Sequence, residues 1–349
     1  MVMNERTFVL KGTICYSNSL TELSITENGY LVCEDGRCAG VFDELPEKFA
    51  GISCTDFGDE LIIPGLTDLH LHAPQYTFRA SGMDLELLDW LNTYTFPQEA
   101  RYEDTEFAKE AYSVFAEDMK KSPNTRACIF GTLHVPATEI LMEQLDKTGI
   151  KAMVGKVNMD RNGSPQLQEE SAQASADATI QWIEDTLDKF ENVKPILTPR
   201  FTPSCSDELM EKLSEIQKKY HLPMQSHLSE NFSEIAWVKE LCPNTHFYGE
   251  AYSQFGLFGG DCPTIMAHCV HSSDEEIALM KSRAFILLIV RSLTQISPQV
   301  SLLRDVIWTK AYTSDWALTL QVELPFLFCV PWLMLFRFPS CTGGWLILL

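Results

Sequence analysis

After residue 60 the chain alternates short apolar segments with amphipathic helical segments, and this order constrains its fold more than any other feature. Strands that are repeatedly separated by helices are typical of βα units on a parallel sheet. The sequence therefore favours a (β/α)8 TIM-type barrel, incomplete at its C-terminal end, and leaves a doubly wound open sheet as the alternative. Six strands are expected at residues 61–72, 125–132, 151–158, 193–201, 222–228 and 263–270, with a seventh candidate at 284–290.

Three regions of the chain differ in character. Residues 1–60 are rich in Val, Ile, Thr and aromatic residues and carry a hairpin turn at Glu34-Asp35-Gly36, which predicts a small N-terminal β domain. Residues 61–283 carry the βα pattern and are expected to form the barrel. Residues 284–349 form an apolar tail that holds four of the seven tryptophans and only three acidic residues.

Two helices illustrate how the boundaries are predicted. A long helix is expected from about residue 166 to residue 190. Another is expected over residues 206–220, with Ser206 or Asp207 as its N-cap, because both residue types cap helices and carboxylates favour the first turn.

A pair of histidines, His70 and His72, ends the first expected strand. Side chains two residues apart in a strand point to the same face, roughly 7 Å apart. Neutral imidazole is a common ligand for zinc and its neighbours, so two such rings can bind one metal ion.

Further polar residues lie near the C-terminal ends of other expected strands: Arg200, His227 and His268. Active sites of (β/α)8 barrels form at that face, so these side chains are expected to converge with His72.

Several motifs together resemble the guanine deaminase family of the amidohydrolase superfamily, from the amino terminus to about Arg283. The combination of HxHAxQY, TPRF and SHxSE is more specific than the superfamily pattern PG(x)₃DxHxH. The segments that carry the resemblance are PGLTDLHLHAPQYTF, GKVNMD, KPILTPRFTPSCSDELM, QSHLSEN and MAHCVHSSDEEI.

The resemblance implies one Zn²⁺ per subunit, held by His70, His72, His227 and His268 and completed in the family by a strand-8 aspartate. Zinc lowers the pKa of bound water to about 7 and so supplies a nucleophile at neutral pH. The implied reaction is attack on C2 of guanine, which gives xanthine and ammonia. Glu230, three residues after His227, is implied as the catalytic proton shuttle.

Substrate recognition is expected from three residues. The guanidinium of Arg200 presents donors that match the O6 and N7 acceptors of guanine, although an ion pair with a carboxylate at the barrel rim is an alternative role. Phe201 would pack against the base, or simply within the core. Gln75 offers an amide donor and acceptor to the other polar edge of the purine.

The tail departs from the family pattern. The family's HCPxSN and GxGxD segments should follow residue 284, and neither is present; Asp305 and Asp315 are the remaining aspartates there. A reading-frame disruption near residue 284 is the favoured explanation, and a membrane-associated tail is the alternative, although prolines and Arg337 interrupt its apolar stretch. Either way, weak or no activity and poor solubility are expected for this chain.

Composition limits the partners and the cellular compartment that we expect for the chain. The net charge of −21 disfavours nucleic acid as a partner. The eleven cysteines form no CxxC pair, and the amino terminus does not resemble a signal peptide, so a cytoplasmic protein is expected. Guanine and water are the expected partners, a membrane is not, and the resemblance is compatible with a homo-oligomer.

Two other functions stay open at this point. The chain could deaminate a different heterocycle, although Arg200 and Gln75 argue against this. It could also be a non-catalytic metal-binding or scaffolding protein that kept the surface of the barrel.

Overall fold

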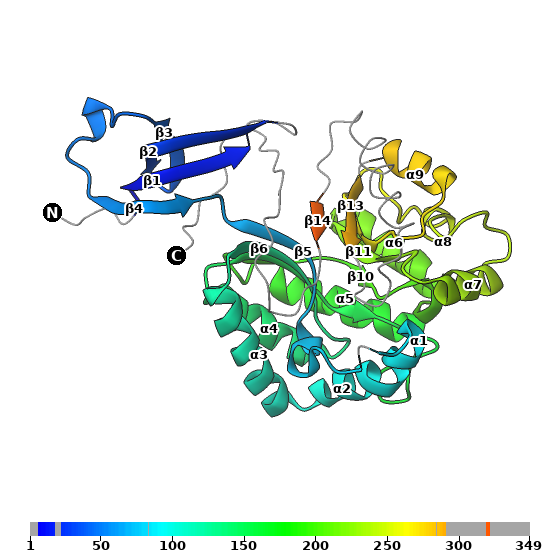
Figure 1. Ribbon diagram of the computed structural model, residues 1–349. Helices are drawn as coiled ribbons and strands as arrows, with labels where there is room; N and C mark the ends of the chain where they lie inside the picture. Colours follow the sequence, from blue (N-terminus) through cyan, green and yellow to red (C-terminus); the bar gives the residue numbers. More distant parts are fainter. Residues whose placement is uncertain (1–5, 18–21, 83, 284, 291–318, 322–349) are drawn as a thin grey trace. The chain divides into compact units, whose positions relative to one another are not determined.

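The computed structural model describes residues 6–17, 22–82, 84–283, 285–290 and 319–321 (Figure 1). These residues fall into two compact units. One contains the described residues up to Thr67 together with Ser122–Arg126. The other contains Asp68–Lys121 and the described residues from Ala127 onward.

The first unit is built on a four-stranded sheet with the order β3-β2-β1-β4. Neighbouring pairs β1–β2 and β2–β3 are antiparallel, whereas β4 pairs in parallel with β1. The expected hairpin turn is present, because Asp35 and Gly36 have positive φ values of 52° and 78° between β2 and β3. The strands are β1 (Phe8–Ser17), β2 (Leu23–Glu34), β3 (Arg37–Phe42) and β4 (Cys54–Ile62).

The continuous strand expected at residues 61–72 is wrong, because the structure divides it. Leu61 and Ile62 end β4 of the small sheet, and β5 (Leu66–His72) begins after Pro64 and Gly65. Proline cannot donate to a strand ladder. A Cβ atom at Gly65 would lie 2.2 Å from Cγ2 of Thr125, so only glycine allows this close approach.

The second unit contains most of the parallel strands, although β5 and β6 begin in the first. Its strand neighbours are β5-β6-β7-β9, β8-β10 and β11-β12-β13-β14, and a parallel bridge from Leu197 to Met224 links the β9–β10 segment to β11. The strands are β6 (Asn124–Phe130), β7 (Lys151–Gly155), β8 (Val157–Asn158), β9 (Val193–Pro195), β10 (Thr198–Pro199), β11 (Met224–Leu228), β12 (Thr264–His268), β13 (Phe285–Val290) and β14 (Thr319–Gln321).

Spatial order in this unit follows chain order, which is the connectivity of a (β/α)8 barrel. A doubly wound sheet instead reverses its order at a switch point. The barrel fold is therefore confirmed over the open sheet. The seventh strand candidate is also confirmed as β13, which pairs in parallel with β12.

Helices follow most strands, and α3 and α4 lie side by side on one flank of the unit (Figure 1). The helices are α1 (Leu87–Trp90), α2 (Phe96–Ala100), α3 (Thr105–Lys121), α4 (Val135–Asp146), α5 (Ala172–Thr186), α6 (Asp207–Tyr220), α7 (Phe232–Leu241), α8 (Glu250–Ser253) and α9 (Asp274–Lys281). A π-helical turn, Leu91–Thr95, joins α1 to α2.

Two helix boundaries test the sequence prediction. The helix expected from about 166 to 190 is shorter at both ends. At the N-terminal end, Ser171 caps α5 by accepting a hydrogen bond from the backbone N–H of Ala174. The N-cap of α6 is Ser206, whose hydroxyl accepts from the backbone N–H of Leu209 at 3.1 Å, and Asp207 is the first helical residue.

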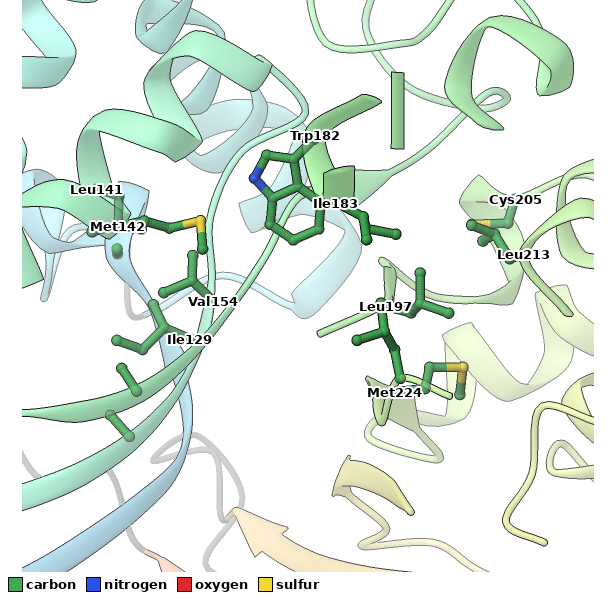
Figure 2. Packing of buried hydrophobic residues seen from close by; sticks show 14 of the residues in the cluster. Ile129, Leu141, Met142, Val154, Trp182, Ile183, Leu197, Cys205, Leu213 and Met224 are labelled. Carbon is green, nitrogen blue, oxygen red and sulfur yellow. The ribbon is translucent and has the colours of Figure 1, made fainter. Parts of the chain in front are cut away.

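Apolar side chains from the helices pack on those of the strands (Figure 2). Trp182 of α5, Leu141 of α4 and Val154 of β7 are each fully buried in this core. Each Å² of apolar surface removed from water stabilises the fold by about 25 cal/mol. This packing holds the βα units together and fixes the strand ends that carry the polar residues.

Much of the apolar tail, including Asp305 and Asp315, lies outside the described residues. Among the described residues, no helix is both long and apolar enough to cross a membrane.

Candidate metal and substrate site

Four histidines converge at the ends of three parallel strands. His70 and His72 end β5, His227 lies in β11 and His268 is the last residue of β12. The ring centroid of His70 lies 4.9 Å from those of His72 and His227 and 5.1 Å from that of His268. The structure thus brings together all four histidines named from the sequence.

Three of these rings are placed where they could hold one metal ion. One nitrogen from each of His70, His227 and His268 lies within 4.8 Å of the others. His72 stands beside this triad, with its Nε2 atom 2.9 Å from Nε2 of His227. Three or four imidazole nitrogens that converge in this way match the donor sets of zinc sites.

The hydrogen bonds of His227 fix its tautomer. Its Nδ1 atom lies 2.6 Å from the backbone carbonyl oxygen of Arg200, and a carbonyl oxygen only accepts, so Nδ1 carries the proton. Nε2 of a neutral His227 then presents a lone pair toward the other rings. A second contact that orients a ligand in this way is usual for metal-binding histidines.

The protonation of the cluster suits a cation. Burial, followed by repulsion between the rings, holds the pKa of His70, His72 and His227 well below the usual range. The rings are therefore neutral near pH 7, the state that binds metal. Nδ1 of His72 is buried and lacks a hydrogen-bond partner among the described residues. The residues present thus fit a divalent metal such as zinc.

Glu230 lies next to the histidines. Its Oε2 atom is 3.3 Å from Nε2 of His268. Ser229, His268 and Cys269 have φ values of 51°, 72° and 52°, the left-handed region that non-glycine residues rarely adopt. Backbone of this kind clusters at functional sites, and here it lies at the ends of β11 and β12.

Glu234, which was not predicted from the sequence, binds the backbone of Glu230. Its carboxylate accepts hydrogen bonds from the backbone N–H of Glu230 at 3.0 Å and from the hydroxyl of Tyr248 at 2.9 Å. Burial, and then the charge of Glu230, raise the pKa of Glu234 to about 7. The capping box formed by Asn231 and Glu234 is a local sequence signal that could have revealed it.

Arg200 and Gln75 meet on a second residue that sequence reasoning missed, Glu99 of α2. Nη1 and Nη2 of Arg200 lie 2.5 and 3.3 Å from the two carboxylate oxygens of Glu99. Nε2 of Gln75 donates to Oε1 of Glu99 at 3.0 Å. The ion pair named as an alternative role of Arg200 is therefore present, and it connects the two residues expected to bind the substrate.

Phe201 is buried and belongs to an apolar cluster with its neighbours. Its ring centroid lies 6.2 Å from that of Trp237, at nearly a right angle. The other buried members of the cluster are Leu91, Phe96, Phe130, Val157, Met159 and Leu167. The core packing named as an alternative role of Phe201 is therefore present.

Comparison with known proteins places this chain in a family. The profile of the amidohydrolase family matches residues 61–309, which is most of the chain and extends past the compositional break near residue 284. A crystal structure of guanine deaminase from C. acetobutylicum, with guanine bound in its active site, superposes with a TM-score of 0.79 at 46% identity. That match covers 81% of this chain and 67% of the other.

Two curated relatives are also guanine deaminases. The protein from Dictyostelium discoideum is 38% identical over 301 residues, or 81% of this chain and 66% of the relative. The protein from Rattus norvegicus is 43% identical over 225 residues, or 64% and 49%. The chain thus spans from half to two thirds of the length of these relatives. On the strength of the family profile and of the strand-end histidines, the chain belongs to the amidohydrolase family, and its similarity is to the guanine deaminases within it.

Proposed function

We propose that this chain is a metal-dependent hydrolase of guanine, which it converts with water to xanthine and ammonia. The observation that carries the proposal is the convergence of four histidines and Glu230 on neighbouring strand ends. The similarity to a guanine deaminase with guanine bound supports the choice of substrate.

Zinc is the proposed metal, and the proposed ligands are His70, His72, His227 and His268. When bound by them, zinc would lower the pKa of water and so make water a nucleophile near pH 7. The chain's own contribution is to supply rings that burial keeps neutral and, at His227, a fixed tautomer.

Glu230 is the proposed proton shuttle. In the reaction, a C–O bond forms at C2 of the purine and the bond from C2 to the exocyclic nitrogen breaks. The carboxylate of Glu230 would take one proton from the attacking water and deliver it to N3 of the ring. The second proton of the water would go to the exocyclic amine, which then leaves as ammonia. Its position beside His268 supports this role.

Arg200 and Gln75 are the proposed substrate ligands, with Phe201 packing at the base. Arg200 would donate to O6 and N7 of guanine. The side-chain amide of Gln75 would form hydrogen bonds with the opposite polar edge of the purine.

Activity in this chain is proposed to be weak. The strand-8 aspartate of the family is not found in a matching motif after residue 284, and that aspartate would otherwise orient the water. Rereading the coding DNA around codon 284 in all three frames tests the explanation: a frame that encodes HCPxSN and GxGxD supports a disruption, and its absence contradicts it.

The test of function is a substrate panel on the full-length, zinc-loaded protein. Guanine, adenine and cytosine derivatives are supplied, and released ammonia and each product are measured. We expect guanine to be the preferred substrate. Preference for another base would favour a different heterocycle deaminase, and stoichiometric zinc without hydrolysis of any base would favour a non-catalytic metal-binding protein.

A further inference from the structure

Glu99 binds both residues proposed to recognise the substrate, although it lies on a different element from either. It sits in α2 and is 1% exposed. Gln75 lies in the 3-10 helix Ala73–Phe78 after β5, and Arg200 follows β10. Three hydrogen bonds converge on its carboxylate, two from Arg200 and one from Gln75.

The placement of Glu99 depends on an irregular helix. The π-helical turn Leu91–Thr95 comes immediately before α2. An extra residue in a turn rotates the next part of the helix by about 100° relative to a regular α-helix, which has 3.6 residues per turn. The same segment supplies Phe96, whose ring centroid lies 5.2 Å from Cζ of Arg200. The segment thus holds the guanidinium of Arg200 through the charge of Glu99 and the ring face of Phe96.

The chemistry of a carboxylate makes this arrangement directional. A carboxylate accepts hydrogen bonds and donates none. Gln75 must therefore turn its NH₂ group toward Glu99, which leaves its carbonyl oxygen as the end that addresses a ligand. Arg200 has five N–H groups in a planar fork, and Glu99 engages one from each Nη atom.

We infer that Glu99 is a positioning residue that sets the hydrogen-bond pattern of the substrate site. With Glu99 in place, a ligand must present acceptors to Arg200 and a donor to Gln75. Guanine offers O6 and N7 as acceptors and N–H groups on its other edges, whereas adenine presents an amino donor where guanine has O6. The inference rests on the proposed function and names Glu99 as the residue that determines the preference for guanine over adenine.

The main test compares Glu99→Gln with the wild-type chain, both zinc-loaded and full-length. Binding of guanine and adenine is measured by calorimetry, together with zinc content. A glutamine at 99 keeps the shape but donates as well as accepts, so Gln75 can flip. We expect guanine affinity to fall at least about tenfold and the preference for guanine over adenine to shrink, since a bidentate contact that discriminates between bases is weakened. Zinc content should not change.

A double-mutant cycle separates positioning from a merely structural role. If Glu99 acts through Gln75, then Glu99→Gln should cost less guanine affinity in a Gln75→Ala background than in the wild type. Equal costs in both backgrounds, with an unchanged preference between bases, would overturn the inference.

A second variant covers the case in which Glu99→Gln does not fold. Glu99→Asp keeps the charge opposite Arg200 but shortens the side chain by one methylene, and it should fold, retain zinc and bind guanine more weakly. Full affinity in Glu99→Asp would contradict the inference. If the wild type binds neither guanine nor xanthine, the proposed function and the inference both fail; if it binds guanine and Glu99→Gln binds it equally, only the inference fails.

Discussion

Nδ1 of His227 lies 2.6 Å from the backbone carbonyl oxygen of Arg200, and this bond joins a proposed metal ligand to a proposed substrate-recognition residue. The ring is thereby held in one tautomer. The partner atom is backbone, so the contact does not depend on the side chain of Arg200. We therefore expect that mutation can separate the loss of substrate binding from the loss of metal binding.

Arg200→Lys tests this separation. Lysine keeps a positive charge near Glu99 but lacks the planar fork, so guanine binding should weaken by about 5- to 150-fold, equivalent to about 1–3 kcal/mol. The backbone carbonyl remains, and zinc content measured by atomic absorption should match that of the wild type. Zinc loss in this variant would mean that the two groups are not separable.

His227→Ala should remove most of the bound metal. The loss of a contact that merely orients a ligand lowers metal affinity about 10- to 100-fold, so loss of the ligand itself should exceed about 100-fold. His246→Ala is the matched control, because His246 is exposed and contacts Glu250 rather than the cluster. Equal zinc affinity in the two variants would exclude His227 as a ligand.

Glu230→Gln should abolish proton transfer while sparing the metal. General acid–base groups contribute about 10²- to 10⁴-fold to the rate, and kcat should fall by that order with zinc retained. Glu240→Gln, an exposed change on α7, is the control and should leave kcat unaltered. A kcat for Glu230→Gln within twofold of the wild type would rule out the shuttle.

The buried Glu234 makes stability depend on pH. Its folded-state pKa is raised from 4.5 to about 7, so between those values the folded chain holds a proton that the unfolded chain has lost. Stability should therefore fall as pH rises through this window. In Glu234→Gln this contribution disappears, so the loss of stability between pH 5 and pH 7 should be smaller than in the wild type by roughly 1–3 kcal/mol. Urea unfolding at several pH values measures it, and identical pH profiles would contradict the assignment.

The sequence predicted those parts of the site that follow from local pattern. His70 and His72 share a strand, and His227 and His268 end later strands, so the barrel connectivity alone brings them together. Glu99 could not be found in this way, because its contact with Arg200 joins residues 101 positions apart and no motif marks it.

The predicted boundaries of strands and helices were wrong where one or two residues interrupt a regular pattern. The apolar run at 61–72 continues through Pro64 and Gly65, but β4 ends at Ile62 and β5 begins only at Leu66, after these two residues. The helical pattern before α5 was extended too far because the side chain of Ser171 competes with helical hydrogen bonds and caps the helix instead.

The most direct test of the proposed function is guanine turnover by the full-length chain with and without zinc. The protein is stripped with a chelator, reloaded with one equivalent of zinc and supplied with guanine, and xanthine is quantified by chromatography. We predict xanthine formation that requires zinc and runs below about 1 s⁻¹, the lower end of ordinary enzyme turnover. No xanthine above the buffer control in the zinc-loaded protein would contradict the proposed function.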